Sequence, residues 1–98
     1  EAGKQGDGEA GEHGGMEIWP NPAGEQIHVR LNMDDGRFNK DLTLVIYNIF
    51  GREVQKIKIP DGQEKILVNV QGFSPGVYIA ILKKSFNLVE SRKFVVAR

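Results

Sequence analysis

Short runs in which apolar and polar residues alternate follow one another along most of this chain. The clearest is 26–32, where Ile27, Val29 and Leu31 occupy every second position and polar residues occupy the others. Successive side chains of a strand point to opposite faces, so this alternation predicts a strand with one buried face. Turn residues separate the runs every ten or so positions, a spacing typical of a β-sandwich or barrel.

We predict seven strands in the part of the chain that follows residue 15, and no segment has a convincing helical period. The predicted strands are 16–19, 26–32, 41–47, 52–59, 64–70, 76–83 and 88–97. The third of them is apolar on both faces, which favours a central strand. The fourth carries Lys56 and Lys58, as an edge strand protected against aggregation would. We therefore expect an all-β, Ig-like antiparallel sandwich of about seven strands.

The connections between the runs support this arrangement. Pro20-Asn21-Pro22 ends the first strand, because each proline fixes φ and lacks an N–H donor. The polar segment 33–40 is long enough to suit a crossing between two sheets better than a tight hairpin. Asn48–Gly51 predicts a tight turn that ends on glycine.

Residues 1–15 differ in composition from the rest of the chain. They hold six glycines and no large apolar side chain, so no burial offsets the entropy of ordering this backbone. We predict a flexible linker at 1–15 and one folded domain at 16–98. Four carboxylates against Lys4 give the linker a charge of −3, and since the whole chain is neutral the domain carries +3. Because the chain begins at Glu1 without a leader, we expect it to belong to a longer protein.

Composition and charge exclude several function classes. The chain has no cysteine, which excludes disulfides, thiolate catalysis and cysteine-based zinc sites. Its formal net charge of zero gives no reason to expect nucleic acid or an anionic membrane as a partner. Its longest apolar run is far shorter than the roughly 20 residues that a membrane helix requires.

The residues that could carry chemistry are few. His13 lies in the predicted linker, and His28 lies on the polar face of a strand. A catalytic triad would need an activated serine beside His28, and no serine of the chain has the glycine-flanked turn of such a nucleophile. Segment 32–36 resembles a calcium loop, but Leu42 stands where an EF-hand has its final glutamate. We therefore expect no enzyme activity, no cofactor and no metal. A domain of this kind acts as a surface that another protein recognises.

Four motifs, in a fixed order along the predicted domain, resemble those of one family. They are IWPNPA at 18–23, VIYNIFGREV at 45–54, GVYI at 76–79 and KFVVAR at 93–98. Together they resemble the segments that characterise the C-terminal sorting domains of the type IX secretion system. Trp19 replaces the family's usual tyrosine, and Phe73 stands at or near its usual leucine, so both departures keep apolar character.

The resemblance implies a secretion signal. In that family, which is found in Bacteroidota, a seven-stranded Ig-like domain is recognised by the outer-membrane translocation and shuttle proteins. For many cargoes a sortase-like surface peptidase then removes the domain and attaches the cargo to lipopolysaccharide. The cleavage point would fall within residues 1–15 or just upstream, where an extended segment suits a protease. The parent protein would be exported through the periplasm to the cell surface or the medium.

The motifs also indicate which residues are of interest for recognition. These are Pro20, Asn21, Pro22, Gly51, Gly76, Tyr78, Lys93, Phe94, Val95, Val96 and Arg98. We expect the last strand, with its basic residues Lys93 and Arg98, to supply the recognised surface. Pro20–Pro22, Gly51 and Gly76 are expected to shape the fold instead.

Two other functions compete with this interpretation. An Ig-like adhesion or glycan-binding module would need an exposed aromatic patch, for which Trp19 and Phe50 are the candidates. A structural spacer would be followed by further domains. We expect a monomer, with exchange of the first strand between copies as the alternative.

Overall fold

The computed structural model describes residues 15–32, 40–85 and 87–97. These residues form seven strands and no helix, as predicted, with bounds that differ from the predicted ones by single residues. The strands are β2 (Met16–Trp19), β3 (Gln26–Leu31), β4 (Leu42–Asn48), β5 (Glu53–Ile59), β6 (Lys65–Asn69), β7 (Gly76–Lys84) and β8 (Asn87–Val96). Accordingly, the described part of the chain offers no helix able to cross a membrane.

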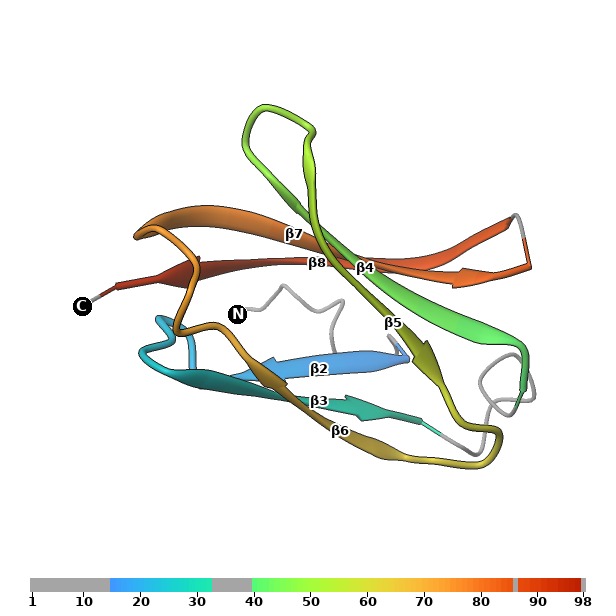
Figure 1. Cartoon of the computed structure of the whole chain (residues 1–98). Helices are drawn as coiled ribbons and strands as arrows, with labels where there is room; N and C mark the ends of the chain where they lie inside the picture. Colours follow the sequence, from blue (N-terminus) through green and yellow to red (C-terminus); the bar gives the residue numbers. More distant parts are fainter. Residues whose placement is uncertain (1–14, 33–39, 86, 98) are drawn as a thin grey trace, which may run out of the picture.

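The strands form two antiparallel sheets that lie face to face, which confirms the predicted sandwich (Figure 1). One sheet has the order β2-β3-β6 and the other the order β5-β4-β7-β8. β4 is thus an inner strand and β5 an edge strand, as the apolar and lysine patterns predicted. The connection after β3 leads from the first sheet to the second, so the predicted crossing between sheets is also confirmed.

The core lies between the two sheets and consists of side chains from alternate strand positions. Ile27, Val29 and Leu31 of β3 all point into it, as their spacing predicted. Its largest fully buried side chains come from both sheets and include Phe94, Met16, Ile27, Leu31, Leu42, Leu44, Ile46, Ile59 and Leu82. Burial of such a side chain contributes about 1.5–3 kcal/mol, so this layer is the main source of stability.

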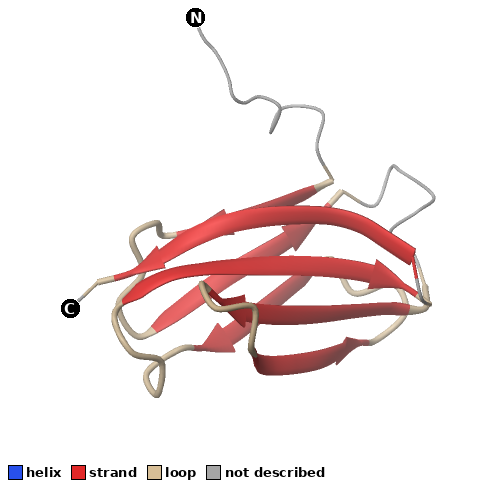
Figure 2. Cartoon of the chain, turned by 90° about the horizontal axis from the view of Figure 1, so that it is seen from above, coloured by secondary structure: helices blue, strands red, loops and turns tan. Residues whose placement is uncertain are grey.

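The first and last strands run in the same direction along one side of the sandwich. The backbone N–H of Gly15, just before β2, bonds Glu90 of β8, and Ala23, beyond β2, forms a parallel bridge with Val96. The start of β2 and the end of β8 therefore lie at opposite ends of the domain (Figure 2). Whatever precedes Gly15 joins the domain at the end opposite to Ala97.

Two predicted features lie outside the described residues. They are residues 1–14 of the predicted linker and residues 33–39, which include most of the segment that resembles a calcium loop. Among the residues that the structure does describe, no group of histidine, aspartate or glutamate side chains is arranged to hold a metal ion.

Candidate recognition surface

The proline motif of the sequence is joined directly to the last strand. The Asn21 side-chain oxygen accepts a hydrogen bond from the Val95 N–H (2.9 Å). The Ala23 N–H donates to the Val95 carbonyl (2.6 Å), and the Ala97 N–H donates to the Ala23 carbonyl (2.8 Å). The peptide bonds before Pro20 and Pro22 are both cis. Two motifs more than seventy positions apart thus form one unit, which covers the edge of β8 at its C-terminal end.

The terminal motif divides between core and surface. Phe94 and Val96 are fully buried between the sheets, whereas Lys93 is exposed and Val95 half-buried on the outer face. Arg98 lies outside the described residues. In the folded domain, Lys93, Ala97 and part of Val95 are therefore the side chains of this motif, within 93–97, that a partner could touch.

Tyr78 fixes the loop that leads into β7. Its hydroxyl donates to the Ser74 carbonyl (2.6 Å), and its ring packs against Phe73 and Phe94 with centroid distances of 5.0 and 5.7 Å. A tyrosine that bonds the backbone a few residues upstream is also a feature of Ig-like sandwiches. Gly76 precedes it at a φ of +152°, a conformation that favours glycine. The Gly-x-Tyr motif is thus a closure of the fold that also contacts the terminal motif.

Gly51 ends a tight turn between β4 and β5, as predicted. The Asn48 side-chain oxygen accepts hydrogen bonds from the N–H groups of Phe50 (2.9 Å) and Arg52 (3.0 Å). The Gly51 N–H closes the turn on the Asn48 carbonyl (3.0 Å), and Gly51 has a φ of +79°, which a side chain would strain. The turn presents Ile49 and Phe50 to solvent, and the Phe50 side chain is 86% exposed.

An open apolar pocket of about 480 Å³ lies beside this turn. Its walls come from the β4–β5 turn, the start of β5, the β6–β7 loop and the start of β7, and include Ile49, Phe50, Val54, Phe73, Pro75 and Val77. The second and third motifs of the sequence are therefore neighbours in space. Tyr78 is the one titratable side chain among the lining residues of this pocket.

The four motifs that the sequence analysis singled out thus make one connected structure, and a family comparison covers the same region. A family model described as "Secretion system C-terminal sorting domain" matches residues 17–97. The chain belongs to this family. Members are targeting signals recognised by the type IX secretion machinery, and they belong to secreted, outer-membrane or cell-surface proteins. A search of curated proteins finds no match.

The two aromatic candidates for glycan binding lie on different sheets of the sorting domain. Trp19 stacks on His28 at a centroid distance of 5.2 Å and an interplanar angle of 12°. This pair lies on the outer face of the three-stranded sheet, whereas Phe50 belongs to a turn of the four-stranded sheet. The pocket beside Phe50 is lined without Trp19, so the two rings do not share a platform there.

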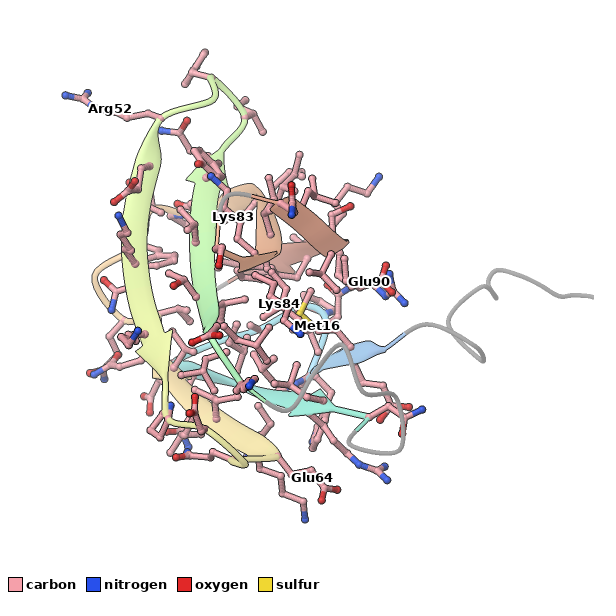
Figure 3. The ribbon with its side chains drawn as sticks, turned by 90° about the vertical axis from the view of Figure 1, so that its right-hand side faces the viewer. Met16, Arg52, Glu64, Lys83, Lys84 and Glu90 are labelled. Carbon is pink, nitrogen blue, oxygen red and sulfur yellow. The ribbon has the colours of Figure 1, made fainter. Side chains whose placement is uncertain are left out.

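One ionic site of the sorting domain was not predicted from the sequence. Glu90 accepts hydrogen bonds from the Gly15 N–H (3.0 Å) and from Arg92 Nη1 (2.8 Å). It lies beside Met16, where β2 begins (Figure 3). Burial by itself raises the pKa of Glu90, but the hydrogen bond from Gly15, then the hydrogen bond and charge of Arg92, then a backbone bond from Ser91 outweigh it, so this pKa is lowered. Glu90, Arg92 and Phe94 occupy every second position of β8 and therefore face inward together. This spacing was the sequence signal from which the inward position of the two charged side chains could have been predicted.

We expect Glu90→Gln to lower the free energy of unfolding by about 1 kcal/mol at neutral pH, because the amide loses the ionic bond to Arg92. Folding lowers the pKa of Glu90. Its contribution is therefore complete above the ordinary value of 4.5, and is lost as the pH falls through the lower folded value. Urea unfolding of both proteins at about pH 7 and about pH 3 measures the loss of stability at neutral pH and its dependence on the Glu90 charge.

The matched control is Glu17→Gln, which removes an exposed ion pair with Arg30 at 3.4 Å and should change the free energy of unfolding by less than about 0.5 kcal/mol. The difference in free energy of unfolding between Glu90→Gln and the native domain should be smaller at the acidic pH than at neutral pH. A difference of equal size at both pH values would contradict the role assigned to the Glu90 charge.

Proposed function

We propose that residues 16–98 act as the export signal of a longer cargo protein, and that a sortase-like surface peptidase cuts before Gly15 and attaches the cargo to the cell surface. The family match over residues 17–97 carries the first part of this proposal. The glycine-rich composition of residues 1–14 supports the second, since proteases cut extended segments.

The placement of the two ends of the domain favours both steps. The chain enters beside Glu90, whereas the Pro20–Pro22 motif and Ala97 lie together at the other end of β8. A peptidase acting on the segment before Gly15 and a receptor holding the far end would approach opposite ends of the sandwich (Figure 2). Their binding would not be mutually exclusive.

Lys93 is the proposed contact residue of the terminal motif, together with Arg98. We assign Pro20–Pro22, Gly51, Gly76 and Tyr78 to shaping the fold, because each sits in a turn, a closure or a strand clamp. Deleting residues 93–98 would remove Phe94 and Val96 from the core. Loss of export after that deletion would therefore report unfolding as much as loss of contact, and substitutions at exposed positions are the sharper test.

Fusion to a neutral cargo tests the proposal. Residues 1–98 are placed after a fluorescent protein carrying a periplasmic export signal, in a Bacteroidota host with a type IX system. We expect the cargo on the surface or in the medium, and in the periplasm when the outer-membrane translocon is deleted. In a host without the surface peptidase, the exported cargo should keep the mass of the domain. Periplasmic retention in the complete host would refute the export role, and an unchanged cargo mass with and without the peptidase would refute cleavage.

A further inference from the structure

An apolar stripe crosses the outer face of the four-stranded sheet, on the side that faces away from the core. Strand pairing places Val45 of β4 opposite Ile81 of β7, and Tyr47 opposite Ile79. Val77 of β7 continues the stripe beside Val95 of β8, and both positions face away from the core. Val77 and Ile79 are 37% and 39% exposed, and Val45 is only 2% exposed although it is not part of the core cluster.

The burial of Val45 shows how closely this outer face is packed. Its neighbours on either side are Lys56 of β5 and Ile81 of β7, and the aliphatic stem of a lysine can cover apolar surface while its charge stays in water. Val45 is therefore shielded by its neighbours, whereas Val77 and Ile79 of the same stripe stay partly exposed. Ile49 and Phe50, the most exposed apolar side chains, lie on the turn beyond its end.

Lysines border this stripe, two on the edge strand β5, one on the edge strand β8 and one on the inner strand β7. Lys56 and Lys58 lie opposite Val45 and Thr43. On the other side, Lys83 lies opposite Thr43, and Lys93 lies opposite Ile79. Within the described ranges, no carboxylate forms an ion pair with any of the four lysines. Among the strand positions, pairing places one carboxylate, Glu53, on this face.

The outer face of the other sheet is different. There, Arg30 lies within 3.4 Å of Glu17 and 3.5 Å of Glu64, so its charge is matched within the domain. The aromatic ring of Trp19 is covered on one side by His28. That face also carries the exposed Leu67 and Lys65. Among the described strands, the four-stranded face is the one that combines several paired apolar side chains with four lysines outside ion pairs.

We infer that this lysine-bordered face is the docking surface for an acidic protein surface with an apolar centre, carried by the secretion machinery; this inference rests on the proposed function. Contact would remove the stripe from water, and the lysines would steer the partner and fix its orientation. A second copy of the domain fits poorly, because two lysine borders would meet. An anionic membrane is the alternative occupant, and the vesicle experiment described below tests it.

The test uses the export fusion, in which two lysines at a time are replaced by the same residue. Lys56→Glu with Lys93→Glu reverses the charge on both borders, and we expect surface-exposed cargo to fall about tenfold or more. Lys56→Arg with Lys93→Arg keeps the charge and should keep export. Lys40→Glu with Lys65→Glu makes the same change in net charge at exposed positions, one before β4 and one on the other sheet, and should also keep export.

A separate pair of substitutions tests the stripe itself. Val77→Thr with Ile79→Thr keeps the β-branched shape but makes two positions polar, and should reduce export with the lysines untouched. The melting temperature of every purified variant must stay within a few degrees of the native domain. A variant that fails this check is replaced by Ile79→Thr alone, since Ile79 is already exposed.

The outcomes separate the two proposals. If the native fusion is not exported, the proposed function and this inference both fail. If the native fusion is exported and the folded Glu variants are exported equally, this inference alone fails.

The purified domain provides the remaining check on the kind of partner. We expect it to be monomeric in light scattering, and to remain in solution with vesicles of phosphatidylcholine and phosphatidylglycerol. Vesicle binding that Lys56→Glu with Lys93→Glu abolishes would overturn the inference in favour of an anionic lipid. A dimer that the same variant dissociates would overturn it in favour of a second copy.

Discussion

Phe94→Ala is expected to lower the free energy of unfolding by about 3–5 kcal/mol, the largest effect of any substitution proposed for this domain. The Phe94 side chain is 0% exposed and is among the largest side chains of the core. It also stacks against Tyr78 at a centroid distance of 5.7 Å, an interaction that alanine cannot replace. In a domain of this size that loss lowers the melting temperature by about 15 °C or more.

Urea unfolding of the purified domain measures this effect, and Leu88→Ala is the matched control. Leu88 belongs to the same strand but its side chain is largely exposed, so we expect a change within about 0.5 kcal/mol. A loss below about 1.5 kcal/mol for Phe94→Ala would contradict its central place in the core. Export of the Phe94→Ala fusion should fall in proportion to the fraction of folded domain. The variant with Lys56→Glu and Lys93→Glu should instead lose export while its domain remains folded.

Ala23→Pro is expected to lower the free energy of unfolding by about 3 kcal/mol. The substitution removes the N–H that donates to the Val95 carbonyl, which leaves that acceptor without its partner. It also places a ring at a position that is 1% exposed. The clamp between the proline motif and the last strand should open, and the edge of β8 would lose its cover.

Gly24→Ala is the control for Ala23→Pro, because a methyl group there meets no atom within 4 Å and the backbone N–H is kept. Urea unfolding should give a change of less than about 0.5 kcal/mol for it. Hydrogen exchange at Val95 and Ala97 should accelerate in Ala23→Pro and not in Gly24→Ala. Unchanged protection of these amides would show that the clamp does not depend on Ala23.

These two predictions share a physical basis. Asn21 and Ala23 bond the backbone of β8, and Phe94 of β8 packs on Tyr78, which closes the loop before β7. The motifs that identify the family are therefore linked through contacts in the fold. The contacts named above occupy Asn21, Tyr78 and Phe94. Lys93 is exposed on the outer face, and we propose it for recognition.

Much of the fold was predictable from residue order alone. Alternation gave the seven strands, because side chains of a strand point to opposite faces and only one face of most strands is buried. The apolar character of both faces of β4 indicated its inner position, and Lys56 and Lys58 indicated the edge position of β5. The Asn48–Gly51 turn followed from the local preference of glycine for a positive φ.

The candidate surface could be predicted only in part. Lys93 was expected to belong to the recognised surface, but nothing in the local pattern of the terminal motif showed that Asn21 would bond Val95, two positions further along. The ionic site at Glu90 depends on the Gly15 N–H, 75 positions away. Such contacts depend on which strands are adjacent and in what register, and residues so far apart leave no local pattern.

The sequence by itself determined the strands, the direction of their buried faces, the tight turns and the resemblance to sorting domains, because each of these depends on residues close together in the chain. Only the tertiary structure decided that the proline motif clamps the last strand and that Val45, Ile79 and Val77 form one stripe between lysines. That stripe is assembled from separate strands, so its extent and charge depend on strand register.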